Sequence, residues 1–283
     1  MKRIFVPTSN AGKLREFEYA FALQGKGCLG INAALAECGN AFDWEIPEED
    51  RETFTGNNCQ KLFPGLRVLP ILAHCQVNSV VVDDSGLCVP RLNFQPGVHS
   101  ATYGGLPRDD AKNRRALIEN LEKDLGLLSS QFEPAFFVCS LLIASESLET
   151  DASSGAVISE HRLISHLEQL EGEIMARVRS RLEDSTTMAY GHKTKLGFAE
   201  KLYDLQLIMG FCLGRVAPFE QQFLEGEGHG YDAMFFPNAK PTLSFASIPL
   251  HEKNKMSHRS EALRGFSVMA QSRTAQDEIL ELF

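Results

Sequence analysis

A near-continuous run of β-branched residues from Val77 to Val82 limits the possible folds more than any other stretch of this chain. Such a run is typical of a strand that is buried on both faces, because polar residues do not alternate with the apolar ones. The polar sequence DDSG follows at once, so Asp83 and Asp84 are predicted to lie at the carboxyl end of this strand. We therefore expect a buried sheet with acidic side chains at its edge, where α/β proteins bind ligands.

Strands and helices alternate along most of the chain. The predicted strands cover 3–7, 77–82, 135–144, 205–216 and 233–236, and the predicted helices cover 13–23 and 110–127. The glycine-rich sequence GEGHGYD separates the last two strands and predicts a turn. This alternation predicts an α/β fold.

The segment 145–203 does not follow this alternation. Its apolar residues have the three-four spacing of one amphipathic helix. They are Leu163, Leu167, Leu170, Ile174, Val178 and Leu182. We predict a single domain over residues 1–283 with a helical insertion at 145–203. The inserted helix either packs on its own domain or on a second copy of the chain, or it carries a site.

The amino-acid composition and net charge limit which classes of binding partner are expected. A hydrophobic share of 43% and a charged share of 23% are ordinary for a globular protein. The net charge of −9 argues against nucleic acid or an anionic membrane surface as the main partner, because both need a basic face. A small polyanion stays possible, since local lysines, arginines and Mg²⁺ can supply positive charge.

The cysteines and the start of the chain indicate a reduced, cytoplasmic protein. The seven cysteines are scattered singly, with no close pair at zinc-ligand spacing. The beginning, MKRIFVPTSN, lacks the apolar stretch of a secretory signal. The longest apolar run, 135–144, is far shorter than the roughly 20 residues that cross a bilayer.

Small and polar residues in TSNAGK precede the first predicted helix, and Ser9 or Asn10 can cap it. Free amides, the helix dipole and the Lys13 ammonium group can converge there on a phosphate. The sequence is not a Walker A loop, because Pro7 stands where that loop has its first glycine and Leu14 follows Lys13. An ordinary capped turn is the alternative.

Asp83 and Asp84 offer two carboxylates in succession. Carboxylates suit Mg²⁺, which takes one or two protein oxygens together with substrate phosphates. One of the two can also deprotonate an attacking water. The alternative is a simple turn, because Asp-Ser-Gly commonly closes a strand.

Two later motifs carry further polar candidates. In GHGYD, His229 and Tyr231 can stack on a base and Asp232 can accept a hydrogen bond from it, although a tight hairpin is the alternative. In KNKMSHRSEAL, Lys253 and Arg259 can donate to phosphate or to a keto oxygen, whereas a solvated basic helix start is the alternative.

The order of these motifs identifies a family. TSNAGKLREF, TFTGNNCQK, VVDDSGLCV with PGVHSATYGG, GHGYDAMFF and EKNKMSHRSEAL follow one another from residue 8 to about residue 263. Together they resemble the successive signatures of the Ham1 or inosine triphosphate pyrophosphatase family. The likeness does not cover the predicted insertion.

This resemblance implies an elongated α/β fold, with a long central mixed β-sheet, flanking helices and two lobes around a nucleotide cleft, usually in a homodimer. It also implies Mg²⁺-dependent hydrolysis of inosine, deoxyinosine and xanthosine triphosphates (ITP, dITP and XTP) to the monophosphate and pyrophosphate. The alternative function is nucleotide binding by the same fold with lost or reduced hydrolysis, acting through a protein partner.

The resemblance also assigns roles to individual residues. Asp84 would be the general base and a Mg²⁺ ligand, Asp83 would assist with the metal, and Ser85 would touch substrate. The triphosphate would be held by Thr8, Ser9, Asn10, Ala11, Gly12, Lys13 and Lys61. The base would be lined by His229, Gly230, Tyr231 and Asp232, Lys253 would reach substrate, and the purine would also be bound by His258 and Arg259. Within this set, His258 and Arg259 would recognise the 6-keto group of the purine.

One departure from the family pattern affects the predicted metal site. Gly56 stands where the family has a glutamate that binds the metal. Its loss is expected to weaken Mg²⁺ binding unless water, Asn57, Asn58 or a nearby acid such as Glu52 substitutes, and neutral amides are poorer ligands than carboxylates for Mg²⁺. His229 also replaces the usual phenylalanine, which adds polarity to the predicted base site.

Overall fold

The computed structural model describes residues 2–39, 44–45, 47–125, 131–147, 157–226, 228–271 and 278–283. The strands are β1 (Arg3–Val6), β2 (Gly27–Gly30), β3 (Val77–Cys88), β4 (Glu133–Glu146), β5 (Val157–Ser159), β6 (Thr187–Phe198), β7 (Lys201–Val216), β8 (Phe235–Pro237) and β9 (Leu280–Glu281). The α-helices are α1 (Ala11–Ala22), α2 (Ile31–Cys38), α3 (Phe54–Leu72), α4 (Asp110–Leu125), α5 (Glu160–Arg179), α6 (Leu250–Lys253) and α7 (His258–Gln271). None of the described helices is both long and apolar enough to cross a bilayer.

In the described part of the chain the strands form one nine-stranded sheet. Its main order is β2-β1-β3-β4-β7-β6-β5, with β8 beside β7 and β9 beside β6. β1 pairs in parallel with β2 and β3, whereas β3, β4, β7 and β6 pair antiparallel in turn. This long mixed sheet with flanking helices confirms the predicted fold class.

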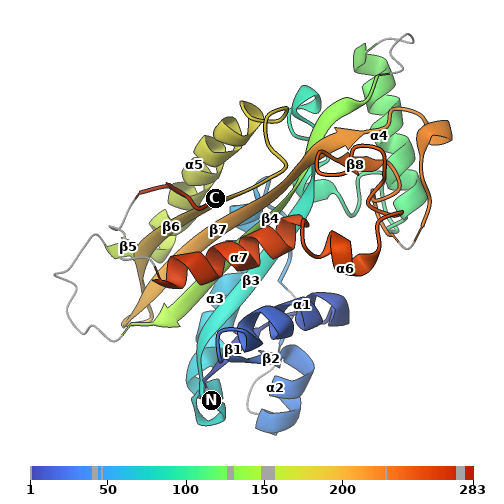
Figure 1. The fold of residues 1–283 in the computed structure, drawn as a ribbon. Coiled ribbons are helices and arrows are strands. Elements are labelled where there is room, and N and C mark those ends of the chain that lie inside the picture. Colours follow the sequence, from blue (N-terminus) through green and yellow to red (C-terminus); the bar gives the residue numbers. More distant parts are fainter. Residues whose placement is uncertain are drawn as a thin grey trace.

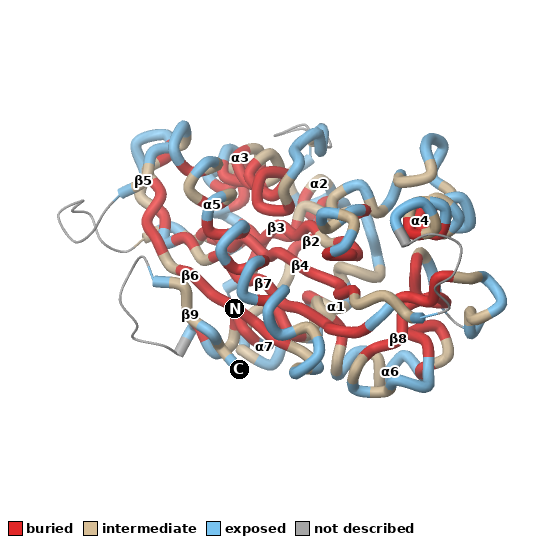
Figure 2. Tube along the Cα trace, turned by 90° about the horizontal axis from the view of Figure 1, so that it is seen from above, coloured by how far each residue is buried: buried red, intermediate tan, exposed pale blue. Residues whose placement is uncertain are grey.

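Helices cover both faces of the sheet. α3 and α5 pack on one face, and α1 and α7 pack on the other (Figure 1, Figure 2). Each face has its own apolar core, with Leu62 and Leu167 under the first pair of helices and Phe17 and Phe266 under the second. A third core joins α4 to β8 at one end of the sheet.

The direction of side chains along β3 decides which layer each residue meets. Val80 and Val82 belong to the core under α3 and α5, whereas Val81 belongs to the core under α1 and α7. Because successive residues of a strand point to opposite faces, Asp83 faces α1 and α7, and Asp84 faces α3 and α5.

The position of the acidic residues in β3 corrects a prediction. β3 does not end before Asp83 but continues to Cys88, because β4 supplies an unbroken antiparallel ladder in which Asp83 pairs with Leu141 and Asp84 with Ser140. The strand that does end nearby is β1, whose last residue paired with β3 is Phe5. The acidic residues therefore lie beside the carboxyl end of β1 and in the middle of their own strand.

The segment 145–203 contains the predicted amphipathic helix, which is α5, and its predicted residues from Leu163 to Val178 are buried. The segment is not helical throughout, however. β6 pairs with β7 from Thr187 to Phe198, and α5 packs over β6. The helical spacing does not extend to Leu182, which lies beyond the end of α5. Residues 148–156 of the segment, like Leu127 at the end of a predicted helix, lie outside the described residues.

Candidate active site

The loop between β1 and α1 holds the predicted phosphate-binding residues. Asn10 caps α1, as predicted, because its Oδ1 accepts hydrogen bonds from the amides of Gly12 at 2.9 Å and Lys13 at 3.1 Å. The Thr8 hydroxyl accepts from the Asn10 amide at 3.2 Å. These amides are therefore engaged within the loop, and an anion here would meet the Lys13 side chain first.

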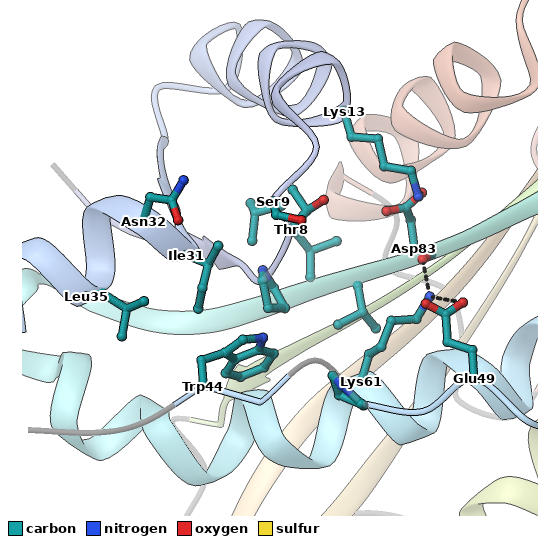
Figure 3. Close-up of a pocket in the computed structure, with 15 residues that line it drawn as sticks. Thr8, Ser9, Lys13, Ile31, Asn32, Leu35, Trp44, Glu49, Lys61 and Asp83 are labelled. Atoms are coloured by element: carbon teal, nitrogen blue, oxygen red, sulfur yellow. Dashed lines mark hydrogen bonds and ion pairs between the residues drawn. The ribbon is translucent and has the colours of Figure 1, made fainter. Parts of the chain in front are cut away.

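A cavity of about 300 Å³ lies at the carboxyl end of β1, within the size range of small-molecule sites (Figure 3). Its polar end is lined by Lys13, Glu49, Lys61 and Asp83, and its apolar end by Ile31, Leu35 and Trp44. Trp44 is held by an edge-to-face contact with Phe5, with ring centroids 5.5 Å apart. This cavity suits a ligand with one anionic and one less polar part.

Cations from three separate elements converge on Asp83. Its carboxylate lies 2.8 Å from Lys13 Nζ and 3.2 Å from an Arg259 Nη, while its carbonyl accepts from Lys61 Nζ at 2.6 Å. Figure 3 shows the two lysines approaching Asp83 from opposite sides. Burial alone would raise the pKa of Asp83, but the three cations hold it well below its ordinary value. Arg259 also donates to the Ser85 hydroxyl at 3.2 Å.

Asp84 has a different environment. It is 7% exposed and accepts hydrogen bonds from Asn57 Nδ2 at 3.0 Å and from the Ser85 amide at 2.8 Å. Burial raises the pKa of Asp84 to about 6, although Lys61 and the Asn57 hydrogen bond oppose this shift. A carboxylate with this pKa is ionised at neutral pH and is still basic enough to take a proton from water.

The two carboxylates do not form the side-by-side metal pair that the sequence predicts. Asp83 and Asp84 are adjacent residues of a continuous strand, so their side chains point to opposite faces of the sheet. Asp83 is occupied by Lys13 and Arg259 on its own face. Among the described residues, Asp84 has hydrogen bonds but no ion pair, so it is the one of the two whose charge is not already paired.

The position of the missing glutamate is filled by another carboxylate. A Cβ atom at Gly56 would lie 2.9 Å from Glu168 Oε1 and 2.6 Å from Thr53 Oγ1. The Thr53 hydroxyl accepts from the Gly56 amide at 3.1 Å and donates to Glu168 at 3.0 Å. A side chain at residue 56 would thus enter space that α5 occupies with Glu168.

A second acid of α5 lies against the same end of α3. Glu171 is 6% exposed and accepts from the amides of Phe54 at 3.2 Å and Thr55 at 2.8 Å. Burial raises the pKa of Glu171, the two amides oppose this, and the charge of Asp84 raises it further. Glu171 and Asp84 therefore lie within electrostatic range of each other.

The substitutes that the sequence offers for the glutamate point elsewhere. Glu52 contacts the exposed His99 at 3.1 Å. Asn58 donates to the Ser140 carbonyl at 2.9 Å, and Asn57 presents its N–H group to Asp84. The acids that do lie near the start of α3 are Glu168 and Glu171 of α5. They come more than a hundred residues later in the chain, so the spacing of the sequence does not predict this contact.

The start of α7 combines two unusual side chains. His258 stacks on Phe137, with centroids 5.1 Å apart, and burial lowers its pKa well below the ordinary value, with Arg259 and Lys253 adding to the shift. Its ring is therefore neutral. His258 Nδ1 and Arg259 Nε are buried and have no hydrogen-bond partner among the described residues. Within the described part of the chain, both atoms are thus unpaired and enclosed by protein atoms.

Lys253 and Asp232 form a direct ion pair near this helix. Their Nζ and Oδ2 atoms are 2.5 Å apart, and Lys253 also lies over the Phe245 ring at 5.0 Å. Asp232 accepts from the His229 amide at 3.1 Å, but the His229 ring is 83% exposed. Gly230 turns the chain with a φ of 61°, and its amide is bound to Asp110 at 2.7 Å.

Tyr231 corrects a prediction, because its ring is not available to stack on a base. The side chain is 3% exposed and belongs to the core between α4 and β8. Its hydroxyl donates to the Ser100 carbonyl at 3.1 Å. An aromatic residue next to glycines is typical of a ligand-binding loop. Here the tyrosine ring instead fills the apolar core under α4.

Three residues that the sequence analysis does not name lie at this site, namely Trp44, Glu168 and Glu171. Trp44 is the single tryptophan of the chain and lies in an otherwise acidic stretch, which is a signal for a binding role. The two glutamates carry no such signal, because acids on an amphipathic helix ordinarily face water.

Comparisons with known proteins place the chain among sequences of one family. The profile of the Ham1 family matches residues 4–181 and 162–269. The chain is 29% identical over 266 residues to a dITP/XTP pyrophosphatase of Gluconobacter oxydans, covering 93% of this chain and 88% of that protein. It is 26% identical over 272 residues to a dITP/XTP pyrophosphatase of Bacillus subtilis, covering 96% and 98%.

Solved structures share the fold. A HAM1 protein from Coxiella burnetii superposes with a TM-score of 0.59 at 21% identity, covering 96% of this chain and 100% of that one. The Ham1 protein of Staphylococcus aureus superposes with a TM-score of 0.57 at 22% identity and the same coverage.

Proposed function

The chain belongs to the Ham1 family, and on this basis we propose that it is a nucleoside triphosphate pyrophosphatase acting on ITP, dITP and XTP. It releases the monophosphate and pyrophosphate. Support comes from the dITP/XTP pyrophosphatases to which it is similar over nearly its whole length. The observation that carries the proposal is that Lys13, Lys61 and Arg259 all contact Asp83 of β3. The next residue of the strand is the buried Asp84, which is the proposed base.

Lys13 and Lys61 bind the triphosphate in this proposal. Both line the polar end of the cavity, and among the described residues Lys13 forms its ion pair with Asp83 and Lys61 forms its ion pair with Glu49. The Glu49 side chain is 43% exposed, so a phosphate can replace it at little expense. Asp83 then keeps Lys13 and Arg259 in place between turnovers.

Asp84 is the general base. It takes a proton from the water that attacks the substrate between its α- and β-phosphates, and its raised pKa of about 6 makes it a stronger base than an exposed aspartate. Asn57 and the Ser85 amide fix its carboxylate from two directions. Lys61, whose charge lowers the pKa of Asp84, keeps the group ionised at neutral pH.

The residues on this face fit a magnesium ion by the chemistry of their donors. Asp84 is a buried carboxylate, and Glu168 and Glu171 bring two more to the start of α3. We infer that Mg²⁺ would be held by Asp84 with help from these two acids of α5, which replace the glutamate that is absent at Gly56. When bound, the ion would neutralise charge on the phosphates.

The keto purine is recognised by the start of α7. His258 Nδ1 and Arg259 Nε are buried without a partner among the described residues, so a ligand group that pairs with them gains stability. Arg259 always donates, which matches a 6-keto oxygen and opposes a 6-amino group. Each mismatch that leaves such a group unpaired costs about 1 to 3 kcal/mol.

The location and assembly are also part of the proposal. Every one of the seven cysteines, all of them within the described residues, is free, which supports a reducing compartment such as the cytoplasm. A homodimer is proposed from the family resemblance alone.

Pyrophosphate release from ITP, dITP, XTP, ATP and GTP, with Mg²⁺ and with a chelator, tests this function. We expect turnover of the first three nucleotides, a strong preference over ATP, and loss of turnover without the metal. Tight nucleotide binding with no pyrophosphate release would contradict the proposal. That result would favour the alternative, a nucleotide-binding protein that acts through a partner.

A further inference from the structure

A cysteine-histidine cluster lies apart from the phosphate end of the cavity. Cys38 is the last residue of α2, and His74 and Cys75 lie in a 3-10 helix, η2 (Ala73–Cys75), directly after α3. The Cys38 and Cys75 sulfurs are 3.9 Å apart, and His74 Nε2 lies 3.8 Å from the first and 3.3 Å from the second. The two cysteines are 37 residues apart in sequence, so their spacing does not predict this contact.

A hydrogen bond orients the histidine toward the two sulfurs. His74 Nδ1 lies 2.6 Å from the Ile71 carbonyl, which can only accept, so Nδ1 carries the proton. In the neutral ring Nε2 then has its lone pair directed at Cys38 and Cys75. Metal-binding histidines are commonly oriented in this way, with the other ring nitrogen donating to a carbonyl.

The distances between the three atoms match the edges of a zinc tetrahedron. Zn–S bonds of about 2.3 Å and Zn–N bonds of about 2.0 Å, at tetrahedral angles, place two sulfurs about 3.8 Å apart and sulfur and nitrogen about 3.5 Å apart. The observed distances of 3.9, 3.8 and 3.3 Å are all within a few tenths of an ångström of these values. The sulfurs are too far apart to be bonded to each other.

The surrounding residues hold the two segments together before any metal binds. Arg3 of β1 donates to both carboxylate oxygens of Glu37 in α2, at 2.8 and 2.6 Å, and to the Cys75 carbonyl at 2.9 Å. Cys75 is buried, Cys38 is partly exposed and His74 is exposed. The cluster therefore has a fixed inner side and an outer side that is open to water.

We propose that Cys38 Sγ, Cys75 Sγ and His74 Nε2 bind one Zn²⁺ ion, with water as the fourth ligand. Each thiol releases its proton to solvent on binding, so two thiolates balance the charge of the ion. The site ties α2 to the end of α3. Because Ile31 and Leu35 of α2 line the apolar end of the cavity, zinc would stabilise that wall.

Titration of the reduced, metal-free protein with Co²⁺ and then Zn²⁺ tests the site. We expect one equivalent of Co²⁺ to give the visible bands of a tetrahedral ion and thiolate-to-cobalt charge-transfer bands, which Zn²⁺ then removes. Cys38→Ser and His74→Ala should weaken zinc binding by more than the roughly 10- to 100-fold typical of an outer-shell change. Cys28→Ser, which alters another partly buried thiol in β2, is the matched control and should bind as wild type does.

Several outcomes would overturn the zinc site. They are no cobalt binding by the reduced protein, bands unchanged in Cys38→Ser, or bands lost equally in Cys28→Ser. Isolation of a Cys38–Cys75 disulfide from protein whose reduced form does not bind zinc would assign the cluster to redox chemistry instead. A second readout is thermal unfolding, which zinc should shift upward in wild type and in Cys28→Ser but not in Cys38→Ser. None of these results bears on the proposed hydrolysis.

Discussion

Two neighbouring residues of β3 have opposite electrostatic surroundings. Asp83 faces α1 and α7 and meets Lys13 and Arg259, whereas Asp84 faces α3 and α5 and meets Asn57 and, at longer range, Glu171. The pKa of Asp83 is held well below its ordinary value, and burial raises that of Asp84 to about 6. Lys13 and Arg259 thus lie on one face of the sheet, whereas Glu171 and a single cation of this group, Lys61, come from the helices on the other face.

This contrast gives Asp83 and Asp84 different proposed roles, although their side chains are chemically identical. The Asp83 charge is already compensated, so it organises the cations that would bind phosphate. The Asp84 charge is buried, and Lys61 and Asn57 compensate it only in part, so a proton or a metal ion would bind there favourably. The central claim is that Asp84 is held in an unfavourable ionised state that serves catalysis and metal binding.

The largest expected effect is on the rate of hydrolysis. Asp84→Asn removes the proposed base and should reduce kcat for dITP by about 10²- to 10⁴-fold. Pyrophosphate release is the measurement, and circular dichroism checks that the variant folds. Wild-type turnover by a folded Asp84→Asn variant would exclude Asp84 as the base.

On the other face, Asp83→Asn should act mainly on stability. It removes the buried partner of Arg259, whose side chain is 12% exposed and which, among the described residues, keeps only the more exposed Glu16 as an ion-pair partner at 3.2 Å. Loss of the pairing with Asp83 should cost about 1 to 3 kcal/mol. Because the pKa of Asp83 is lowered by folding, this stabilisation is complete at neutral pH and disappears only in acid, as the pH falls below the ordinary range of an aspartate. Urea unfolding at neutral pH measures it, and an unchanged midpoint would show that the cluster contributes nothing.

The acids of α5 sharpen the comparison through metal binding. Glu168→Gln should weaken Mn²⁺ binding, measured by electron paramagnetic resonance, by roughly 10- to 100-fold. Glu173→Gln, the same change at an exposed position of the same helix, is the control and should have no effect. Equal affinities in the two variants would remove Glu168 from the metal site.

A rescue experiment tests the same point from the other side. Gly56→Glu alone should bind metal poorly, because its Cβ would lie 2.9 Å from Glu168 Oε1. Gly56→Glu combined with Glu168→Ala removes the Glu168 contact, and with rotation of the Thr53 hydroxyl, which lies 2.6 Å from the added Cβ, it should recover affinity. Recovery by the single variant alone would show that Glu168 is not the substitute for the missing glutamate.

The smallest effect is the pH dependence of kcat/KM, which reports the free enzyme. Since the base acts when it is deprotonated, and the pKa of Asp84 is about 6, kcat/KM should fall about tenfold for each pH unit below that value. A profile that stays flat well below pH 6 would contradict the assignment.

Much of the fold follows from local patterns, and the errors have physical causes. Helix α5 and strand β4 are recognisable because their apolar spacing is regular. Strand β6 (TMAYGHKTKLGF) is not, because glycines, His192 and Lys195 interrupt its pattern while neighbouring strands and helices bury it. The local pattern predicts that β3 ends before DDSG, because only the pairing with β4 shows that the strand continues through these residues.

The site was predictable where the motif itself carries the chemistry. Lys13, Lys61 and Arg259 do meet around Asp83. Tyr231 does not face the site, because the demand of the core under α4 cannot be read from its loop. Glu168, Glu171 and the Cys38 cluster depend on contacts between segments that are distant in sequence, so no local pattern predicts them.

The most direct test of the central claim is the free energy of unfolding of Asp84→Asn at neutral pH. Because folding raises the pKa of Asp84 to about 6, wild-type stability is lost as the pH rises through that value, and a neutral side chain avoids the loss. We expect the inactive variant to be more stable than wild type by about 1 to 3 kcal/mol, with the difference vanishing in acid. A variant that is less stable than wild type at neutral pH would contradict the claim, because Asp84 would then be a stabilising charge like Asp83.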